Sequence, residues 1–521
     1  MRARIPTGQR DSMTTAPDRA PPSADRPTTT LLIVLALGVV AIHCLFNGNY
    51  GFHRDELATI DDARVLAWGY VAYPPLTAAF GRLSLTLFGP SLIGLRLFPA
   101  LAFGVSMLLT GLTAREFGAS RQTQLFAAVV MAFAPVALLG SSLYQYVAFD
   151  YLAWVMLSWC VVRLLNSADA RWWLAIGAVI GLGLLTKYTV LVWVAGLGVG
   201  TLLTPARAYL ANRWLWLGVA LCVLLFLPNL CWQWQHDFVS LDFLTHIHER
   251  DVRIGRTDGF IRDQFLDCAN PVTVPVWLAG LYFLLFANAG RRYRLLGWMF
   301  VATFALLLLL RGRAYYFAPA YPLLIAAGSV MWQHSLARLR GGVARTLLAL
   351  SWIVLLGCGM ALALLFIPVA PLHSRLWEIS ATVHDNFREQ IGWPNLAQTV
   401  ANIYAAIPDD QQAGVAALTA NYGEAGALNL YRGEYRLPPV ISAVNSYWLR
   451  GYGEPPPQQL IVLGYSPQRL AELFEDCSLA GSVVNVDRVD NEESRDHPDI
   501  YLCRQPREPW PAIWPKMRHY G

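Results

Sequence analysis

A charged stretch between two apolar runs holds the first residues that could do chemistry. Asp55 and Glu56 are the candidates for catalysis, because a partly desolvated carboxylate at a membrane boundary can act as a general base. The alternative is structural: Asp55 would be the N-cap of a short interfacial helix over 53–68, whose dipole favours acids in its first turn. The ionisable residues of this stretch are His53, Arg54, Asp55, Glu56, Asp61, Asp62 and Arg64.

Asp61, Asp62 and Arg64 are predicted to lie on the solvated face of that helix. Two further ionisable residues stand inside apolar stretches. Asp150 lies about one turn inside the outer end of an apolar segment, where an ionisable group is a functional candidate by default. The alternative for Asp150 is a structural hydrogen bond to another helix. Lys187 could neutralise a phosphate, or its ammonium could extend to the membrane interface.

A third group of candidates carries positive charge. Arg311 and Arg313 precede Tyr315 and Tyr316 at a boundary where a positive-inside bias disfavours cations. An anionic partner such as a lipid phosphate would explain them, since Arg binds phosphate through two parallel hydrogen bonds. Arg256 is a further candidate for such a phosphate. Ordinary contact with lipid headgroups is the alternative for these side chains.

Composition identifies the class of protein that must position these residues. The chain has 521 residues, 55% hydrophobic and 14% charged, whereas soluble proteins have about 25% charged residues. A polytopic membrane protein is therefore predicted. No basic surface interleaved with aromatics suggests nucleic acid. No Walker A motif, dinucleotide fingerprint or repeated half supports a pump or a secondary transporter.

The hydropathy pattern predicts about eleven transmembrane helices. The short basic clusters then all fall on one side, which places the N-terminus inside. The predicted domains are a disordered cytoplasmic tail (1–28), a transmembrane domain (29–370) with outer loops 48–90 and 234–270, and an extracytoplasmic domain (371–521). The predicted spans are 29–47, 91–114, 121–139, 145–165, 172–186, 188–204, 213–233, 271–289, 294–310, 314–333 and 346–369.

The segment 371–521 is predicted to be a small α/β domain. The stretches AGVAALTANY, PPVISAV and QQLIVLGY are typical of short strands, and SPQRLAELFED is typical of a helix with Ser466 as its N-cap. Strands that alternate with helices indicate an α/β arrangement. An oxidising location would permit a disulfide between Cys477 and Cys503. No cofactor is predicted with certainty; a divalent metal ion stays open as an alternative, but no Cys/His spacing in the sequence supports it.

Several stretches together resemble a known family. FHRDELATIDDARVLAWGYVAYPPLTAAFGRLSLTLFG, LRLFPALAFG, LGLLTKYTVL, WQHDF and YYFAPAYPLLIAAG are similar to bacterial members of glycosyltransferase family 39. These are relatives of the protein O-mannosyltransferases and of the lipid A aminoarabinose transferase. The stretch LTANYGEAGALNLYRGEYRLPPVISAVNSYWL resembles the tail of the same group. The resemblance covers about residues 30–520.

The resemblance implies a GT-C fold in a bacterial inner membrane, with the active site on the outer face. It implies an inverting transfer of a sugar from a polyprenyl-phosphate donor to a glycan, lipid or protein acceptor. The presumed general base maps to Asp55, with Glu56 beside it and Asp150 as a second acidic position. Lys187, Arg313 and Arg256 would hold the lipid phosphate. The alternatives are a polyprenyl-lipid flippase or transporter and a non-catalytic envelope assembly protein.

Overall fold

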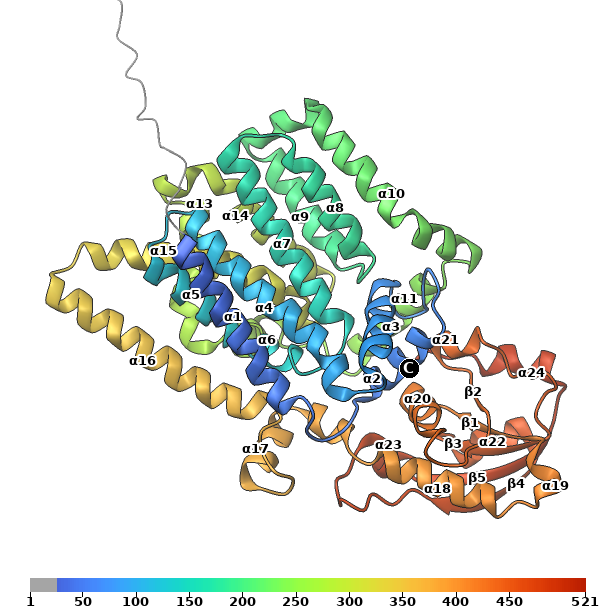
Figure 1. The fold of residues 1–521 in the computed structure, drawn as a ribbon. Coiled ribbons are helices and arrows are strands. Elements are labelled where there is room, and N and C mark those ends of the chain that lie inside the picture. The colour runs from blue at the N-terminus through green and yellow to red at the C-terminus, as the bar shows by residue number, and fades with distance from the viewer. Residues whose placement is uncertain (1–25) are drawn as a thin grey trace, which may run out of the picture.

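The computed structural model describes residues 26–521 and consists of a helical bundle joined to a C-terminal α/β domain (Figure 1). Residues 1–25 of the predicted tail (1–28) lie outside the described residues. From residue 26 the chain is already helical, as the start of α1. The long helices of the bundle are α1 (Arg26–Phe46), α4 (Leu92–Glu116), α7 (Tyr146–Ser167), α10 (Arg213–Gln235), α14 (Arg294–Leu309), α15 (Tyr321–Ala337) and α16 (Gly341–Phe366).

Each of the eleven predicted apolar segments holds a helix, but several of these helices are short. Within residues 26–521, seven helices are long and apolar enough to cross a membrane, with α14 and α15 extended by the 3-10 turns η3 (Asn288–Tyr293) and η4 (Ala314–Ala320). The number rises to nine if each of two bent pairs is one span. The predicted number of about eleven is therefore higher than helix length supports.

The shorter elements explain this difference. Helix α9 (Val190–Leu202) turns by 105° into η1 (Pro205–Ala211). Helix α12 (Phe260–Leu266) is at 90° to the segment that follows it. A proline begins the segment after each bend, Pro205 in η1 and Pro271 in η2. Pro135 likewise begins α6, after the break at residues 133–134 that separates it from α5. Proline favours the first turn of a helix. The other elements are α5 (Arg121–Ala132), α6 (Pro135–Gly140), α8 (Trp172–Leu184), η2 (Pro271–Thr273) and α13 (Val274–Leu285).

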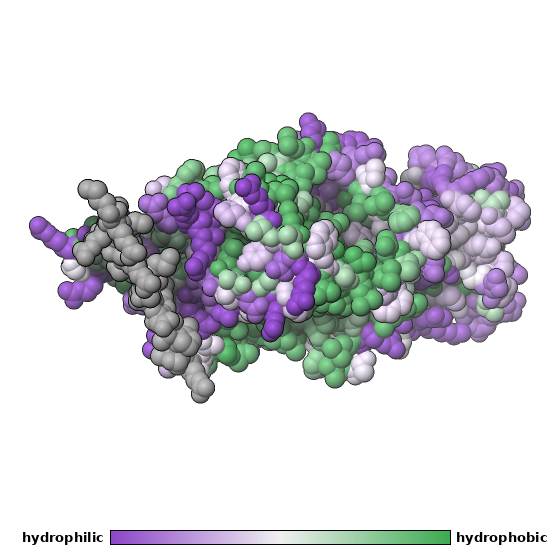
Figure 2. All heavy atoms as spheres, turned by 90° about the horizontal axis from the view of Figure 1, so that it is seen from above, coloured by the Kyte–Doolittle hydropathy of each residue, from purple (hydrophilic) through white to green (hydrophobic). Residues whose placement is uncertain are grey.

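Burial separates the central helices from the peripheral ones. The hydrophobic windows of the α15 span, α7 and α4 are 78%, 72% and 61% buried, whereas those of α1, α10 and α16 are 22%, 17% and 11% buried. Helices α10 and α16 lie at opposite edges of the bundle in Figure 1. Hydrophobic residues gather along the middle of the molecule between polar ends in Figure 2. Such apolar peripheral helices are suited to contact with lipid.

Small residues let neighbouring helices of the bundle approach closely. A Cβ atom at Gly177 of α8 would lie 2.0 Å from the carbonyl oxygen of Gly218 of α10. No side chain larger than hydrogen fits at this crossing. Close packing of this kind replaces the hydrophobic effect as the attraction between helices within lipid. The contact fixes α8, and with it the loop that carries Lys187.

The segment between α1 and α4 forms α2 (Arg54–Arg64) and α3 (Leu76–Phe88). The predicted helix is present, but its N-cap is His53 rather than Asp55. The His53 side chain accepts a hydrogen bond from the Asp55 amide, and the Glu56 side chain accepts one from the His53 amide, at 3.2 and 2.8 Å. This capping box occupies Glu56 and leaves the carboxylate of Asp55 available to other partners.

The C-terminal domain contains one five-stranded sheet of order β2-β1-β3-β5-β4. Strands β1 (Val415–Thr419), β2 (Val440–Ser442) and β3 (Gln459–Leu463) are parallel and were predicted. Strands β4 (Phe474–Ser482) and β5 (Asp499–Pro506) add an antiparallel pair that the sequence pattern did not indicate. The helices of this part are α17 (Arg375–Val383), η5 (Asp385–Gln390), α18 (Trp393–Ala405), α19 (Asp409–Gln412), α20 (Tyr422–Tyr431), α21 (Asn445–Trp448), α22 (Pro467–Leu473), α23 (Glu492–Asp496) and α24 (Trp510–Met517).

Two local predictions for this domain are confirmed. Ser466 is the N-cap of α22, where its hydroxyl accepts a hydrogen bond from the Arg469 amide. Cys477 and Cys503 form a disulfide. The two cysteines are directly opposite each other on β4 and β5, so the disulfide joins the two strands at the antiparallel edge of the sheet.

The helix α2 packs against the C-terminal domain, which corrects the predicted solvation of Asp61 and Asp62. Both residues are only 4% exposed. Asp61 accepts hydrogen bonds from Asn429 and Tyr447 at 2.6 and 2.8 Å. The sequence pattern assigned Asp61 and Asp62 to a solvated face because the surface that covers them comes from residues 429–450, far along the chain. Asp62 pairs with Arg450 and Tyr73.

Candidate active site

A cavity of about 720 Å³ lies between one end of the helical bundle and the C-terminal domain. Its bundle side is formed by α2, the start of α7, the turn between α8 and α9, η4, and helix α11 (Val239–Arg253). Its other side is formed by residues of the C-terminal domain. The predicted site residues that line it are Asp55, Lys187, Arg256, Arg313 and Tyr316. The cavity thus brings together five of the eight predicted residues.

Asp55 is held at the boundary between the two parts of the protein. One carboxylate oxygen accepts a hydrogen bond from the Tyr422 hydroxyl at 2.8 Å, and the other accepts one from the Gln145 amide. His53 Nδ1 lies 3.8 Å from the second oxygen. The Asp55 side chain is 35% exposed, so its carboxylate remains accessible from the cavity. Gln145 precedes α7 and Tyr422 begins α20, so bundle and domain both orient this carboxylate.

Glu56 lies outside the cavity and is fully buried. Its two oxygens accept hydrogen bonds from Arg96 Nε and Nη2 at 2.8 and 2.7 Å. The amides of Tyr144 and His53 also donate to them, both at 2.8 Å. Four donors therefore occupy this carboxylate. Arg96 is fully buried as well, so the pair anchors α2 to α4 beside Asp55.

Lys187 sits among three tyrosine rings. Its ammonium nitrogen lies 4.9, 5.5 and 4.0 Å from the ring centroids of Tyr146, Tyr315 and Tyr316. Aromatic faces attract a cation without neutralising it. The positive charge therefore stays available to an anion in the cavity.

Asp150 stabilises the turn that carries Lys187. It is 2% exposed and does not line the cavity. Its oxygens accept hydrogen bonds from Thr189 and Trp154 at 2.8 and 3.1 Å. The bond to Thr189 fixes the turn that also carries Lys187, so the structural hydrogen bond considered for Asp150 is present.

Arg313 and Arg256 are the other predicted cations at the cavity. Arg313 Nε donates to Asp251 of α11 at 2.5 Å, and its Nη1 lies 3.3 Å from the Tyr315 hydroxyl. Arg250 also faces the cavity, 3.9 Å from the other oxygen of Asp251. One carboxylate is thus shared by two guanidinium groups. With Lys187 and Arg256, the bundle side has a clear excess of positive charge.

The C-terminal domain contributes residues that the sequence reasoning missed. Tyr422 and Glu424 lie at the start of α20, and Glu492 and Glu493 begin α23. All four line the cavity. The pattern Asn421-x-x-Glu424 is a capping box, a signal that could have located the start of α20 but not its position against Asp55. Burial raises the pKa of Glu424 to about 7.

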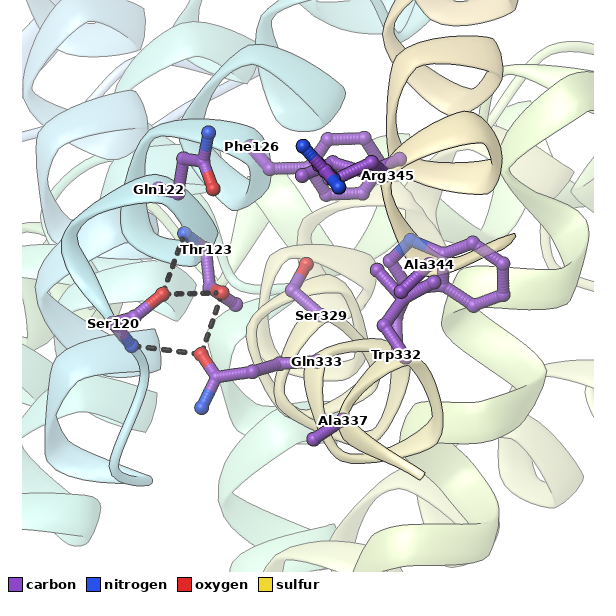
Figure 3. Close-up of a pocket in the computed structure, with 12 residues that line it drawn as sticks. Ser120, Gln122, Thr123, Phe126, Ser329, Trp332, Gln333, Ala337, Ala344 and Arg345 are labelled. Carbon is purple, nitrogen blue, oxygen red and sulfur yellow. Dashed lines mark hydrogen bonds between the residues drawn. The ribbon is translucent and has the colours of Figure 1, made fainter. Parts of the chain in front are cut away.

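A second cavity, of about 280 Å³, lies between α5, α15 and α16 (Figure 3). On one side Thr123 and the Ser120 amide hydrogen-bond to Gln333 at 2.6 and 2.8 Å. Its other lining is mainly apolar, with Arg345 at one side. None of the predicted site residues lines it. Among residues 26–521, no group of three or more His, Cys, Asp or Glu is placed to hold a metal ion.

Comparisons with known proteins agree with this architecture. Residues 72–232 match the family model described as dolichyl-phosphate-mannose-protein mannosyltransferase. The lipid A galacturonosyltransferase RgtD from Rhizobium johnstonii is 28% identical over 280 residues. These residues are 52% of this chain and 58% of the relative, so the match spans less than two thirds of that protein.

Two solved structures are similar over most of the chain. The crystal structure of ArnT from Cupriavidus metallidurans in the apo state has a TM-score of 0.55 and 16% identity, and covers 92% of this chain and 98% of its own. The same protein bound to undecaprenyl phosphate has a TM-score of 0.52 and 14% identity, with the same coverage. These likenesses confirm the predicted GT-C fold and the predicted resemblance to the protein mannosyltransferase family, whose model the chain matches over residues 72–232.

Proposed function

We propose that this protein is an inverting membrane glycosyltransferase that moves a sugar from a polyprenyl-phosphate donor to a hydroxyl of an acceptor. The observation that carries the proposal is the shared cavity. Its bundle side presents a partly exposed carboxylate, Asp55, and a set of cations that includes Lys187, Arg256 and Arg313. A base and a phosphate-binding group are the two parts that such a transfer requires.

In the proposed reaction, Asp55 accepts the proton of the acceptor hydroxyl. The acceptor oxygen attacks the anomeric carbon and forms the new glycosidic bond. The bond between that carbon and the phosphate oxygen breaks, and its electron pair stays on the phosphate. Attack opposite the leaving group inverts the anomeric centre. The phosphate needs no general acid, since Lys187 and Arg313 stabilise the charge that develops on it.

Glu56 and Asp150 have positioning roles in this proposal. Glu56 holds α2 through its buried pair with Arg96, and Asp150 holds the turn of Lys187 through Thr189. Tyr315 and Tyr316 orient the Lys187 ammonium. Tyr422 and Gln145 hold the two oxygens of Asp55 in a fixed orientation. The Asp55 carboxylate and the Lys187 ammonium are therefore each held in position by neighbouring side chains.

The choice of donor rests on the phosphate chemistry and on the relatives. The relative RgtD is named a galacturonosyltransferase, and the related solved structure of ArnT holds undecaprenyl phosphate. A polyprenyl chain fits a cavity that borders membrane helices, with its phosphate against the cations. We place this cavity on the outer face of a bacterial inner membrane, with the N-terminus cytoplasmic and the C-terminal domain outside, because the short basic clusters then all lie inside.

The test separates transfer from transport. Purified protein in lipid vesicles is incubated with a radiolabelled polyprenyl-phosphate sugar and an envelope lipid extract as the acceptor. Transfer of label to the acceptor, with inversion of the anomeric centre, is the expected result. Movement of the labelled lipid between leaflets without any transfer would instead support a flippase. Absence of both activities would favour a non-catalytic role in envelope assembly.

A further inference from the structure

The C-terminal side of the cavity is formed by the carboxyl ends of parallel strands. Ala420 follows β1, Asn445 follows β2 at a short distance, and Gly464 follows β3, and all three residues line the cavity. In open α/β sheets, ligands bind just outside the carboxyl ends of the strands. The domain therefore offers its usual ligand-binding edge to the same cavity that contains Asp55.

This edge is acidic. Glu424, Glu492 and Glu493 line the cavity, and Glu389 lies behind them. Arg54 is the cation among them: its Nη1 contacts Glu492 and lies 4.0 Å from Glu389. One guanidinium cannot neutralise four carboxyl groups. We call Glu424, Glu492 and Glu493 the acidic wall.

Glu493 is the member of the acidic wall that lacks a partner. It is 4% exposed, and neither of its carboxyl oxygens accepts a hydrogen bond from another of the described residues. Glu424 differs, because one of its oxygens accepts a hydrogen bond from the Asn421 amide at 3.1 Å. A buried polar group without a partner is unfavourable, so it indicates a ligand that supplies the missing donor.

The electrostatic surroundings of Glu493 favour a cationic donor over a neutral one. Burial, together with the nearby Glu389 and Glu424, raises the pKa of Glu493 well above its usual value. A cation would relieve this repulsion and make charge-assisted hydrogen bonds, which are about twice as strong as neutral ones. A sugar hydroxyl would supply a donor but would not allow these neighbouring carboxyl groups to ionise together.

We propose that the acidic wall is an acceptor subsite that binds a primary ammonium group carried by the acceptor. The assignment to the acceptor rests on the proposed function, in which Lys187 and Arg313 hold the donor phosphate. Asp55 lies between these cations and the acidic wall, because its own oxygens contact Gln145 on the bundle side and Tyr422 on the domain side. A nucleophile that approaches Asp55 from the domain side would pass along the acidic wall.

The first test measures binding without any lipid donor. Purified full-length protein in lipid nanodiscs is titrated calorimetrically with D-glucosamine and with N-acetyl-D-glucosamine, which differ in the charge of one nitrogen. We expect saturable binding of glucosamine and at least about tenfold weaker binding of the neutral sugar. Equal affinities, or no saturable binding of glucosamine, would overturn the proposal.

A second test identifies the residue. Glu493→Gln should remove the preference for glucosamine, whereas the matched control Glu434→Gln, which changes an exposed glutamate of the same domain, should keep it. A further measurement uses the unaltered protein, so its result does not depend on whether the variant folds. At pH 6, binding of the ammonium group should release protons from the acidic wall, so the measured enthalpy should vary with the ionisation enthalpy of the buffer. A binding enthalpy that is the same in all buffers would contradict the proposal.

These tests are independent of the proposed transfer reaction. If the protein binds glucosamine selectively but transfers no sugar from any polyprenyl-phosphate donor, the proposed function fails and the ammonium site remains. If transfer occurs but neither the selectivity nor the proton release is found, the acceptor subsite alone is refuted.

Discussion

Lys187 is one of only two lysines in the chain, which offers a matched comparison. Lys187→Met should lower transfer by about 100-fold at limiting donor, because the partly buried cation that we propose for the donor phosphate is lost. Lys516→Met should leave transfer unchanged, since Lys516 is exposed and pairs with Glu508. Steady-state kinetics with varied concentrations of labelled donor provide the measurement. Equal activity of the two variants would remove Lys187 from the phosphate site.

Glu56 offers a second prediction at the scale of the residue. Glu56→Gln leaves the fully buried Arg96 without a charged partner, which should destabilise the protein by about 3–5 kcal/mol. The melting temperature in detergent should therefore fall clearly. Glu472→Gln, an exposed change in α22, should have little effect. An unchanged melting temperature for Glu56→Gln would show that this pair does not anchor α2.

The sequence indicated which single residues line the cavity better than it indicated their partners. Asp55, Lys187 and Arg313 could be chosen because ionisable groups are rare in an apolar chain. The difference between Asp55 and its neighbour Glu56 could not be predicted, because it depends on Arg96 and on the start of α7. Asp61 and Asp62 were assigned to a solvated face for the same reason, since Asn429, Tyr447 and Arg450 are far away in sequence.

At the scale of elements, the start of α20 links the C-terminal domain to α2. Glu424 lies here with a pKa that burial raises to about 7, above the value of 4.5 for an unperturbed glutamate. A group whose pKa is raised by folding stabilises the folded state below its unfolded pKa, and this contribution is lost as pH rises through the folded pKa. The contribution of Glu424 is therefore largest below about pH 4.5 and fades towards pH 7.

This linkage predicts a flatter pH dependence for Glu424→Gln. Between pH 5 and 8 the unaltered protein should lose stability relative to the variant, by up to about 3 kcal/mol. Melting temperatures of both proteins across this range measure the effect. Parallel curves would show that Glu424 titrates in the folded protein much as it does in the unfolded chain.

The elements themselves were largely predictable, with instructive exceptions. Each apolar segment holds a helix, and the parallel strands β1, β2 and β3 follow from short apolar runs bounded by turn residues. Strand β4 was missed because its side chains are mostly exposed and it is held through β5 and the disulfide. The bends after α9 and α12 could not be separated from straight spans by hydropathy alone.

For the whole molecule, the basic loops predict that the C-terminal domain lies outside. The disulfide of that domain provides a direct probe. After mild reduction of intact cells that lack their outer membrane, a membrane-impermeant maleimide should label Cys477, which is partly exposed, whereas Cys503 is buried. A variant with serine at both positions should lose this signal and serves as the control. Labelling that requires lysis would place the domain and the proposed active site on the inner side.

The central claim is that Asp55 is the base in a cavity shared by two parts of the molecule. Transfer of labelled sugar by Asp55→Asn in a single turnover tests it most directly. We expect a loss of about 100- to 10,000-fold in rate with donor binding retained, and a smaller loss for Tyr422→Phe, which removes one hydrogen bond to Asp55. A transfer rate for Asp55→Asn equal to that of the unaltered protein would contradict it.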